Sequence, residues 1–160
     1  MAEPFEFDEE DNGIDLESFD GFLTAEETTE WFRAWTGNAA VTGSQFRVFA
    51  QDGTGGYAAF WLVRDGRELA DQPVVFLGSE GETGVVARDL ADFLWLLAGG
   101  LGPGEAADEY RRSPDLPADG TRTAVAERFA PERRRPPLEI VESAGAEFPG
   151  FEAFVMELCE

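Results

Sequence analysis

The segment from Phe49 to Gly100 constrains the fold most, because its short apolar runs alternate with turns rich in acidic residues and glycine. The run from Tyr57 to Val63 is continuously apolar, which is typical of a strand covered on both faces. The preceding turn, Asp52-Gly53-Thr54-Gly55-Gly56, contains residues that tolerate positive φ. Strands joined by links this short pair antiparallel with their neighbours. The segment therefore predicts a meander of short strands.

Turn residues divide this meander into individual strands. Asp65-Gly66 predicts a tight hairpin, Pro73 opens the next strand, and Ser79-Glu80-Gly81-Glu82 turns the chain again. We expect strands over residues 45–51, 57–63, 74–77 and 83–87.

Capping residues and apolar spacing predict the helices. Thr24-Ala25-Glu26-Glu27 fits a capping box before a helix that Gly37 ends. Asp89 is the expected N-cap of a second helix, whose apolar face has the i, i+3, i+4, i+7 spacing of Leu90, Phe93, Leu94 and Leu97. Further helices are expected at residues 105–110, 121–130 and 151–159. The sequence Arg133-Arg134-Arg135-Pro136-Pro137 breaks the chain after the second of these.

The chain of 160 residues is expected to form one domain with an acidic extension. Residues 1–23 contain many acidic residues and no basic residue, interleaved with apolar side chains such as Phe5 and Phe19. This arm is either a solvated segment whose aromatic residues pack on the folded domain, or an acidic and aromatic segment that binds a basic partner. Residues 24–160 are predicted to form a single α+β domain.

The absence of histidine and lysine removes most catalytic chemistry. The chain has no Ser-His-Asp triad, no imidazole metal ligand and no Schiff-base lysine, and Cys159 is its only cysteine. We therefore expect no enzymatic activity, no cofactor and no metal. A carboxylate hydrolase that uses Asp52 and Glu80 is the remaining catalytic hypothesis, although both residues also suit their turns.

The net charge of −21 bears on the kind of partner. A chain this acidic repels nucleic acids and anionic membranes and attracts basic proteins, unless the charge serves solubility alone. No signal peptide or membrane-spanning run is visible, so a cytoplasmic location is expected. Seven of the twelve arginines lie between Arg111 and Arg135. They could clamp phosphate, but neutralisation of carboxylates within the fold is the favoured interpretation.

The central segment also resembles the SUKH superfamily, in its bacterial immunity-protein branch. The resemblance is carried by Asp52-Gly53-Thr54-Gly55-Gly56 with Ala58-Ala59-Phe60-Trp61-Leu62, by the segment from Pro73 to Glu82, by Val85-Val86-Ala87, and by the helix after Asp89. It extends over residues 46–107 and is looser in the first helix and at Phe148-Pro149-Gly150-Phe151. It implies an α+β fold with an antiparallel-dominated sheet of about four to six strands, flanked by helices on one side.

The resemblance further implies a non-enzymatic immunity protein that binds and neutralises a cognate toxin of a polymorphic toxin system, such as a basic nuclease or deaminase. The alternative function is a regulatory scaffold that docks host proteins without a toxin. We expect a monomer that binds neither nucleic acid nor membrane. Charge and position nominate the partner-binding residues Asp8, Glu9, Glu10, Asp11, Asp52, Glu80 and Glu82.

Overall fold

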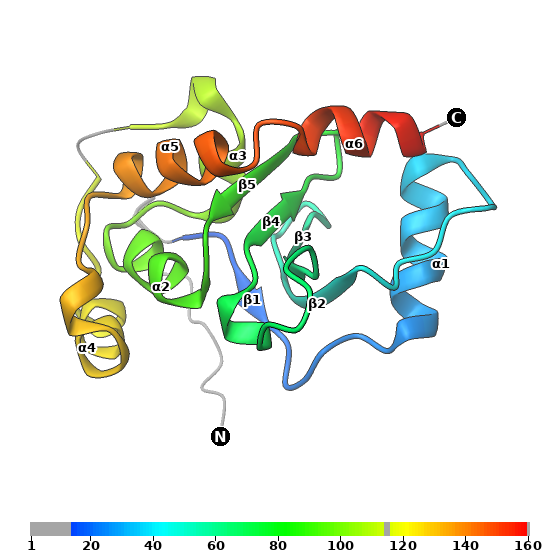
Figure 1. Ribbon diagram of the computed structural model, residues 1–160. Helices are drawn as coiled ribbons and strands as arrows, with labels where there is room; N and C mark the ends of the chain where they lie inside the picture. Colours follow the sequence, from blue (N-terminus) through cyan, green and yellow to red (C-terminus); the bar gives the residue numbers. More distant parts are fainter. Residues whose placement is uncertain (1–13, 114–115, 160) are drawn as a thin grey trace.

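The computed structural model describes residues 14–113 and 116–159 and contains one antiparallel sheet with helices around it (Figure 1). Five strands lie in chain order, each hydrogen-bonded to the next: β1 (Glu17–Ser18), β2 (Phe46–Gln51), β3 (Tyr57–Trp61), β4 (Val74–Leu77) and β5 (Thr83–Ala87). The helices are α1 (Ala25–Thr36), α2 (Leu90–Ala98), α3 (Pro103–Ala107), α4 (Gly120–Phe129), α5 (Pro137–Glu147) and α6 (Phe151–Leu158). The predicted α+β class is confirmed.

Helices cover both faces of this sheet, whereas the resemblance implied helices on one side only. On one face, side chains that include Phe60, Val74 and Phe76 pack with α2, α4 and most of α5. On the other face, Val48, Val75 and their neighbours pack with α1 and α6. All four residues of β4 are buried, because a central strand between two helical layers has no solvent-facing side.

The described part of the acidic arm belongs to the sheet. β1 pairs antiparallel with β2 through Glu17 and Ser18, and Ile14 and Leu16 are buried in the core. Phe19 docks edge-on against Tyr57 with the ring centroids 6.1 Å apart. The fold therefore begins before residue 24, and Glu17–Ser18 form an edge strand of its sheet.

The link between β3 and β4 differs from the sequence expectation. Asp65-Gly66 does not close a tight hairpin, because β3 ends at Trp61 and β4 begins at Val74. The longer connection contains a 3-10 turn, η1 (Leu69–Asp71), and Gly66 has a positive φ of 70°. Buried Gln72 secures the connection, since its side chain accepts from Arg64 N at 2.9 Å and donates to Arg64 O at 2.7 Å. β3 and β4 still pair with each other, so the strands of the sheet follow the order of the chain.

Helix α5 was not predicted from the sequence. Pro136-Pro137 does end the preceding segment, but Pro137 is also the first residue of α5, a position that suits the fixed φ of proline. The helix then buries Ile140, Val141 and Ala144 and packs along β5 (Figure 1). Pro136-Pro137 therefore ends the preceding segment, as the sequence indicates, and also begins the next helix.

The predicted capping box of α1 is present. Glu27 N donates to Thr24 Oγ1 at 3.1 Å, and Thr24 N donates to Glu27 Oε2 at 2.8 Å. The backbone N–H of Thr24, which donates to the Glu27 carboxylate, is the main reason why the pKa of Glu27 is lowered, and the Thr24 side chain adds to the effect. Gly37 ends the helix in the left-handed region with φ of 71°. The first helix of the fold thus starts and stops where its sequence signals indicate.

Thr24→Ala is expected to lower the free energy of unfolding by about 1 kcal/mol, because a helix amide loses its acceptor. The pKa of Glu27 should rise only in part in this variant, because the backbone N–H of residue 24 remains and only the contribution of the Thr24 side chain is lost. Since the folded-state pKa is lowered, the ionised Glu27 stabilises the fold above its ordinary pKa, and this contribution disappears as the pH falls through the folded value. Urea unfolding and carboxylate titration by NMR measure both effects. Thr24→Ser keeps the acceptor and should change neither, and an equal loss in Thr24→Ser would contradict the capping explanation.

Candidate protein-binding groove

The structure uses the Asp52 carboxylate to hold the β2–β3 turn. Asp52 Oδ1 accepts from Thr54 N at 3.0 Å, from Thr54 Oγ1 at 2.8 Å and from Gly56 N at 2.8 Å. Gly56 is required here, because a Cβ at this position would lie 2.6 Å from the Phe76 ring. Asp52 is therefore placed as a turn residue, as its sequence context also allowed.

The other described residues nominated for binding lie in the β4–β5 turn. Glu80 is exposed at its tip, and Gly81 has a positive φ of 96°. Ser79 Oγ donates to Thr54 Oγ1 at 3.1 Å, which joins this turn to the turn that contains Asp52. Glu82 follows at the start of β5. The remaining nominated residues, Asp8, Glu9, Glu10 and Asp11, lie outside the described residues.

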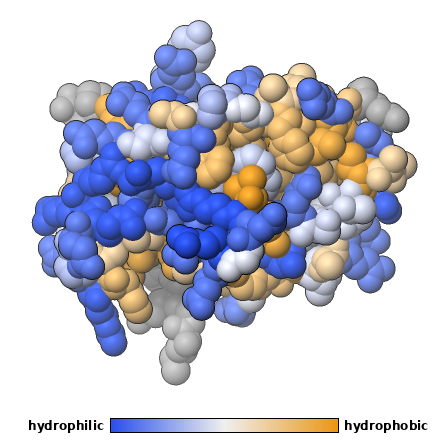
Figure 2. Space-filling view, in the orientation of Figure 1, coloured by the Kyte–Doolittle hydropathy of each residue, from blue (hydrophilic) through white to orange (hydrophobic). Residues whose placement is uncertain are grey.

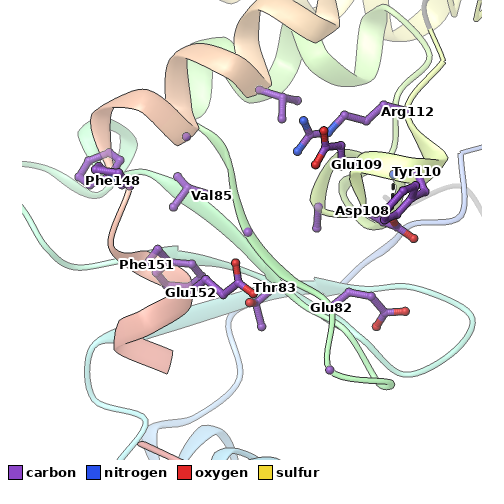
Figure 3. A pocket seen from close by; sticks show the side chains of 16 residues that line it. Glu82, Thr83, Val85, Asp108, Glu109, Tyr110, Arg112, Phe148, Phe151 and Glu152 are labelled. Atoms are coloured by element: carbon purple, nitrogen blue, oxygen red, sulfur yellow. Dashed lines mark hydrogen bonds between the residues drawn. The ribbon is translucent and has the colours of Figure 1, made fainter. Parts of the chain in front are cut away.

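A hollow of about 480 Å³ lies beside the first half of β5 (Figure 3). We call it the β5 groove. Three segments that are distant in the sequence form it: residues 81–85 of the turn and strand, residues 107–112 after α3, and the end of α5 with the α5–α6 turn, residues 145–152, together with Val141 of α5. Glycines keep it open. A Cβ on Gly84 would be 3.3 Å from Ala107, and Gly145 places no side chain in the hollow.

Carboxylates surround the β5 groove. Glu82, Asp108, Glu109 and Glu152 line it, and Arg112 is the one basic residue among the described lining residues. Asp108 Oδ1 accepts from Tyr110 N at 3.0 Å, and Arg112 Nε donates to Ala106 O at 2.8 Å. Within the described chain, no ion pair neutralises any of the four carboxylates. The groove is therefore a site of uncompensated negative charge.

Aromatic residues give the groove a fixed wall and a free rim. Phe148 and Phe151 pack against Trp61 with ring centroids 5.6 Å and 4.8 Å apart, which anchors the α5–α6 turn. Tyr110 is 98% exposed and stands at the opposite rim (Figure 3). Exposed tyrosine beside a preformed hollow is a typical anchor in protein interfaces, because it buries a large area with little loss of rotamer entropy.

A second hollow, of about 470 Å³, is lined by arginines instead. Arg64, Arg67, Arg88 and Arg133 surround it with Asp89 and Glu147. In the orientation of Figure 2, a continuous hydrophilic band crosses the face of the molecule, while apolar surface gathers near α6.

The arginines of this second hollow neutralise the Asp89–Asp92 pair at the start of α2. Arg133 donates to Asp89 Oδ2 at 2.8 Å and to Asp92 Oδ1 at 2.9 Å, and Arg88 Nε donates to Asp92 Oδ2 at 2.9 Å. The hydrogen bond to Asp89 is the main reason why the pKa of Arg133 is raised. Asp92 has no exposed surface. The predicted neutralisation of internal carboxylates by the arginine segment is confirmed.

Two other structural features bear on the function. Among the described residues, no cluster of three or more His, Cys, Asp and Glu side chains has a geometry that could hold a metal ion. No helix in this part of the chain is long and apolar enough to cross a membrane.

Comparison with protein-family models, with curated proteins and with solved structures found no match to this chain. The SUKH resemblance therefore remains a prediction from the residues quoted for it.

Sequence reasoning nominated Glu82 but missed the other residues of the β5 groove. Asp108, Glu109 and Glu152 are three acids among many, and no local pattern distinguishes them. One available signal was Tyr110, an aromatic residue in a segment rich in glycine, proline and charge. The assembly of the groove from separate segments could be recognised only in the folded chain.

Proposed function

We propose that this protein is a non-enzymatic immunity protein that binds a basic protein toxin in the cytoplasm and neutralises it by one-to-one association. One observation carries the proposal: the β5 groove combines four carboxylates without ion-pair partners and an exposed aromatic residue, Tyr110, at its rim. At the arginine-lined hollow, in contrast, Asp89 and Asp92 are paired with arginine. Unpaired acids around a hollow suit a partner that brings the positive charge.

The overall charge supports the same proposal. A net charge of −21 raises the encounter rate with a basic protein, and the groove then supplies a local target for the basic surface. Fast capture matters for a protein that has to block a toxin before the toxin acts. Such steering weakens with salt, so the association rate should fall as ionic strength rises.

A growth assay tests this function. The open reading frames that flank the gene are expressed singly in a bacterial host, with and without this chain. We expect one of them to encode a basic protein that stops growth, and co-expression of this chain to restore growth, because stoichiometric binding removes the free toxin. A matched control is Glu30→Arg combined with Glu157→Arg, two exposed acids outside the groove, which should rescue as well as the wild type.

If no flanking frame is toxic, or if toxicity persists at equal expression of this chain, the immunity proposal is wrong. Stable co-purification with host proteins in that case would favour the regulatory scaffold. A direct binding measurement between the purified toxin and this chain, at low and high salt, separates failure of binding from failure of expression.

A further inference from the structure

The geometry of the β4–β5 hairpin determines which peptide groups of β5 face outward. Gly78 N donates to Glu82 O at 2.7 Å, so the Glu82 carbonyl faces β4. Peptide orientation alternates along an antiparallel strand, so Gly84, opposite Phe76, also faces β4. The N–H and C=O groups of Thr83 and Val85 therefore face away from the sheet.

These outward groups have no partner in the described chain. β5 is the last strand of the sheet, and no loop or helix residue hydrogen-bonds to Thr83 or Val85. Both residues line the β5 groove, the hollow beside this strand. Each offers one donor and one acceptor to an incoming chain.

The open half of β5 has none of the usual protection of an edge strand. Proteins commonly block such edges with charged residues, proline or a bulge. Residues Thr83–Val85 contain no charge and no proline, and the irregular register of β5 lies further along, near Val86. α5 packs along the strand, and burial increases from partly buried Thr83 and Gly84, through Val85 at 6% exposure, to fully buried Val86 and Ala87. One end of the edge is thus covered and the other end is available.

We propose that an extended basic segment of the partner protein adds to β5 as a further strand and pairs with the peptide groups of Thr83 and Val85. This inference rests on the proposed function and specifies how the same groove is used. Main-chain hydrogen bonds would supply affinity, and lysine or arginine side chains of the segment would meet Glu82, Asp108, Glu109 and Glu152. Tyr110 would close over the added strand from the rim.

Charge decides between the possible occupants of this edge. The N-terminal residues of this chain, 1–13, contain six acids and no basic residue, so they would be repelled by the four carboxylates of the groove. A second copy paired edge to edge would bring the same acidic groove against itself. A basic partner segment is the occupant that neutralises the site.

The test uses a capped hexapeptide of alternating lysine and valine with the full-length protein. We expect the peptide to slow amide hydrogen exchange at Thr83 and Val85 by about tenfold or more at saturation, as observed by NMR. The same peptide N-methylated at alternate residues keeps its charge but loses donors, and should bind about tenfold more weakly or worse. A peptide with glutamate in place of lysine should not bind.

A pair of protein variants tests the same hydrogen bonds through changes in the protein in place of the peptide. Thr83→Pro removes the outward N–H at the first strand position, where proline is tolerated, and should weaken peptide binding by about tenfold. Thr83→Val keeps the backbone donor and should bind as the wild type does. Circular dichroism and thermal melting check that both variants fold, and the N-methylated peptide tests the proposal without altering the protein.

Three results would overturn strand addition: equal binding of the N-methylated peptide, protection of amides elsewhere in place of Thr83 and Val85, or no binding up to about 10 mM. Peptide-independent dimerisation that protects the same amides would assign the edge to a second copy and also overturn it. In the growth assay, full rescue of growth by the Thr83→Pro variant would rule out strand addition and would still support the immunity proposal. Failure to find a toxin would remove the immunity proposal and leave the peptide result unaffected.

Discussion

Asp92→Ala is expected to lower the free energy of unfolding by about 3 kcal/mol, the largest loss that we predict for a charged residue of this fold. Asp92 is fully buried and lies within 2.9 Å of nitrogen atoms of both Arg88 and Arg133, with Arg135 at 3.8 Å. Its removal leaves several guanidinium groups without their shared partner. These arginines are 27–36% exposed and can partly rehydrate, which places the expected loss at the lower end of the range for broken buried pairs.

Urea unfolding measures this loss against a matched control. Glu139→Ala removes an acid that is 61% exposed and 4.0 Å from Arg135, and should change the free energy of unfolding by no more than about 0.5 kcal/mol. Both substitutions place alanine in a helix, so helix propensity does not separate them. Asp92→Asn retains the shape and one acceptor and should fall between the two. A loss below about 1 kcal/mol for Asp92→Ala would contradict the structural role of the arginine cluster.

Glu109→Arg combined with Glu152→Arg is expected to lower the affinity for the toxin by about hundredfold or more. The two substitutions convert the acidic β5 groove into one that repels a basic segment, and like charges in contact cost several kcal/mol. The association rate at low salt should fall by about tenfold, and its dependence on salt should become flatter. Surface plasmon resonance at two ionic strengths measures both quantities.

The control for this pair has the same net charge. Glu30→Arg with Glu157→Arg places two positive charges on α1 and α6 outside the groove, so it reduces the overall charge without changing the site. We expect less than about a threefold change in affinity. If both pairs weaken binding equally, net charge alone drives association, and the groove has no special role.

Features encoded over a few residues could be predicted from the sequence. The capping box at Thr24, the N-cap at Asp89 and the turn at Asp52 depend on neighbours within the same turn, and all three are present. The strands β2 to β5 follow from apolar runs between glycine turns, and their antiparallel order follows from the short links.

Features that depend on tertiary contacts could not be predicted in the same way. The periodicity of Leu90, Phe93, Leu94 and Leu97 suggested the apolar face of a helix, but of these four only Phe93 is fully buried. The other three are partly buried, and α2 instead buries Asp92, Trp95, Leu96 and Ala98. Asp92 can be buried on this helix because Arg133 and Arg135 form ion pairs with it. No local sequence pattern predicts this interaction, because the arginines are about 40 residues further along the chain. The helical coverage of both sheet faces depends on α5 and α6 returning to the sheet after a long polar segment.

The candidate site illustrates the same limit. Charge density drew attention to the N-terminal acids and to the turn residues Asp52 and Glu80, because acids are concentrated there in the sequence. The groove instead collects single acids from separated segments around an edge strand. What distinguishes Glu109 and Glu152 is that the fold gathers them around one hollow, which is a property of the folded chain alone.

Amide hydrogen exchange of this protein, free and bound to the toxin identified in the growth assay, tests the central claim most directly. The account predicts that toxin binding slows exchange within residues 81–85, 107–112 and 145–152, with Thr83 and Val85 among the most protected amides. Protection located on α1, on the arginine-lined hollow or spread evenly over the chain would contradict the assignment of the β5 groove as the binding site.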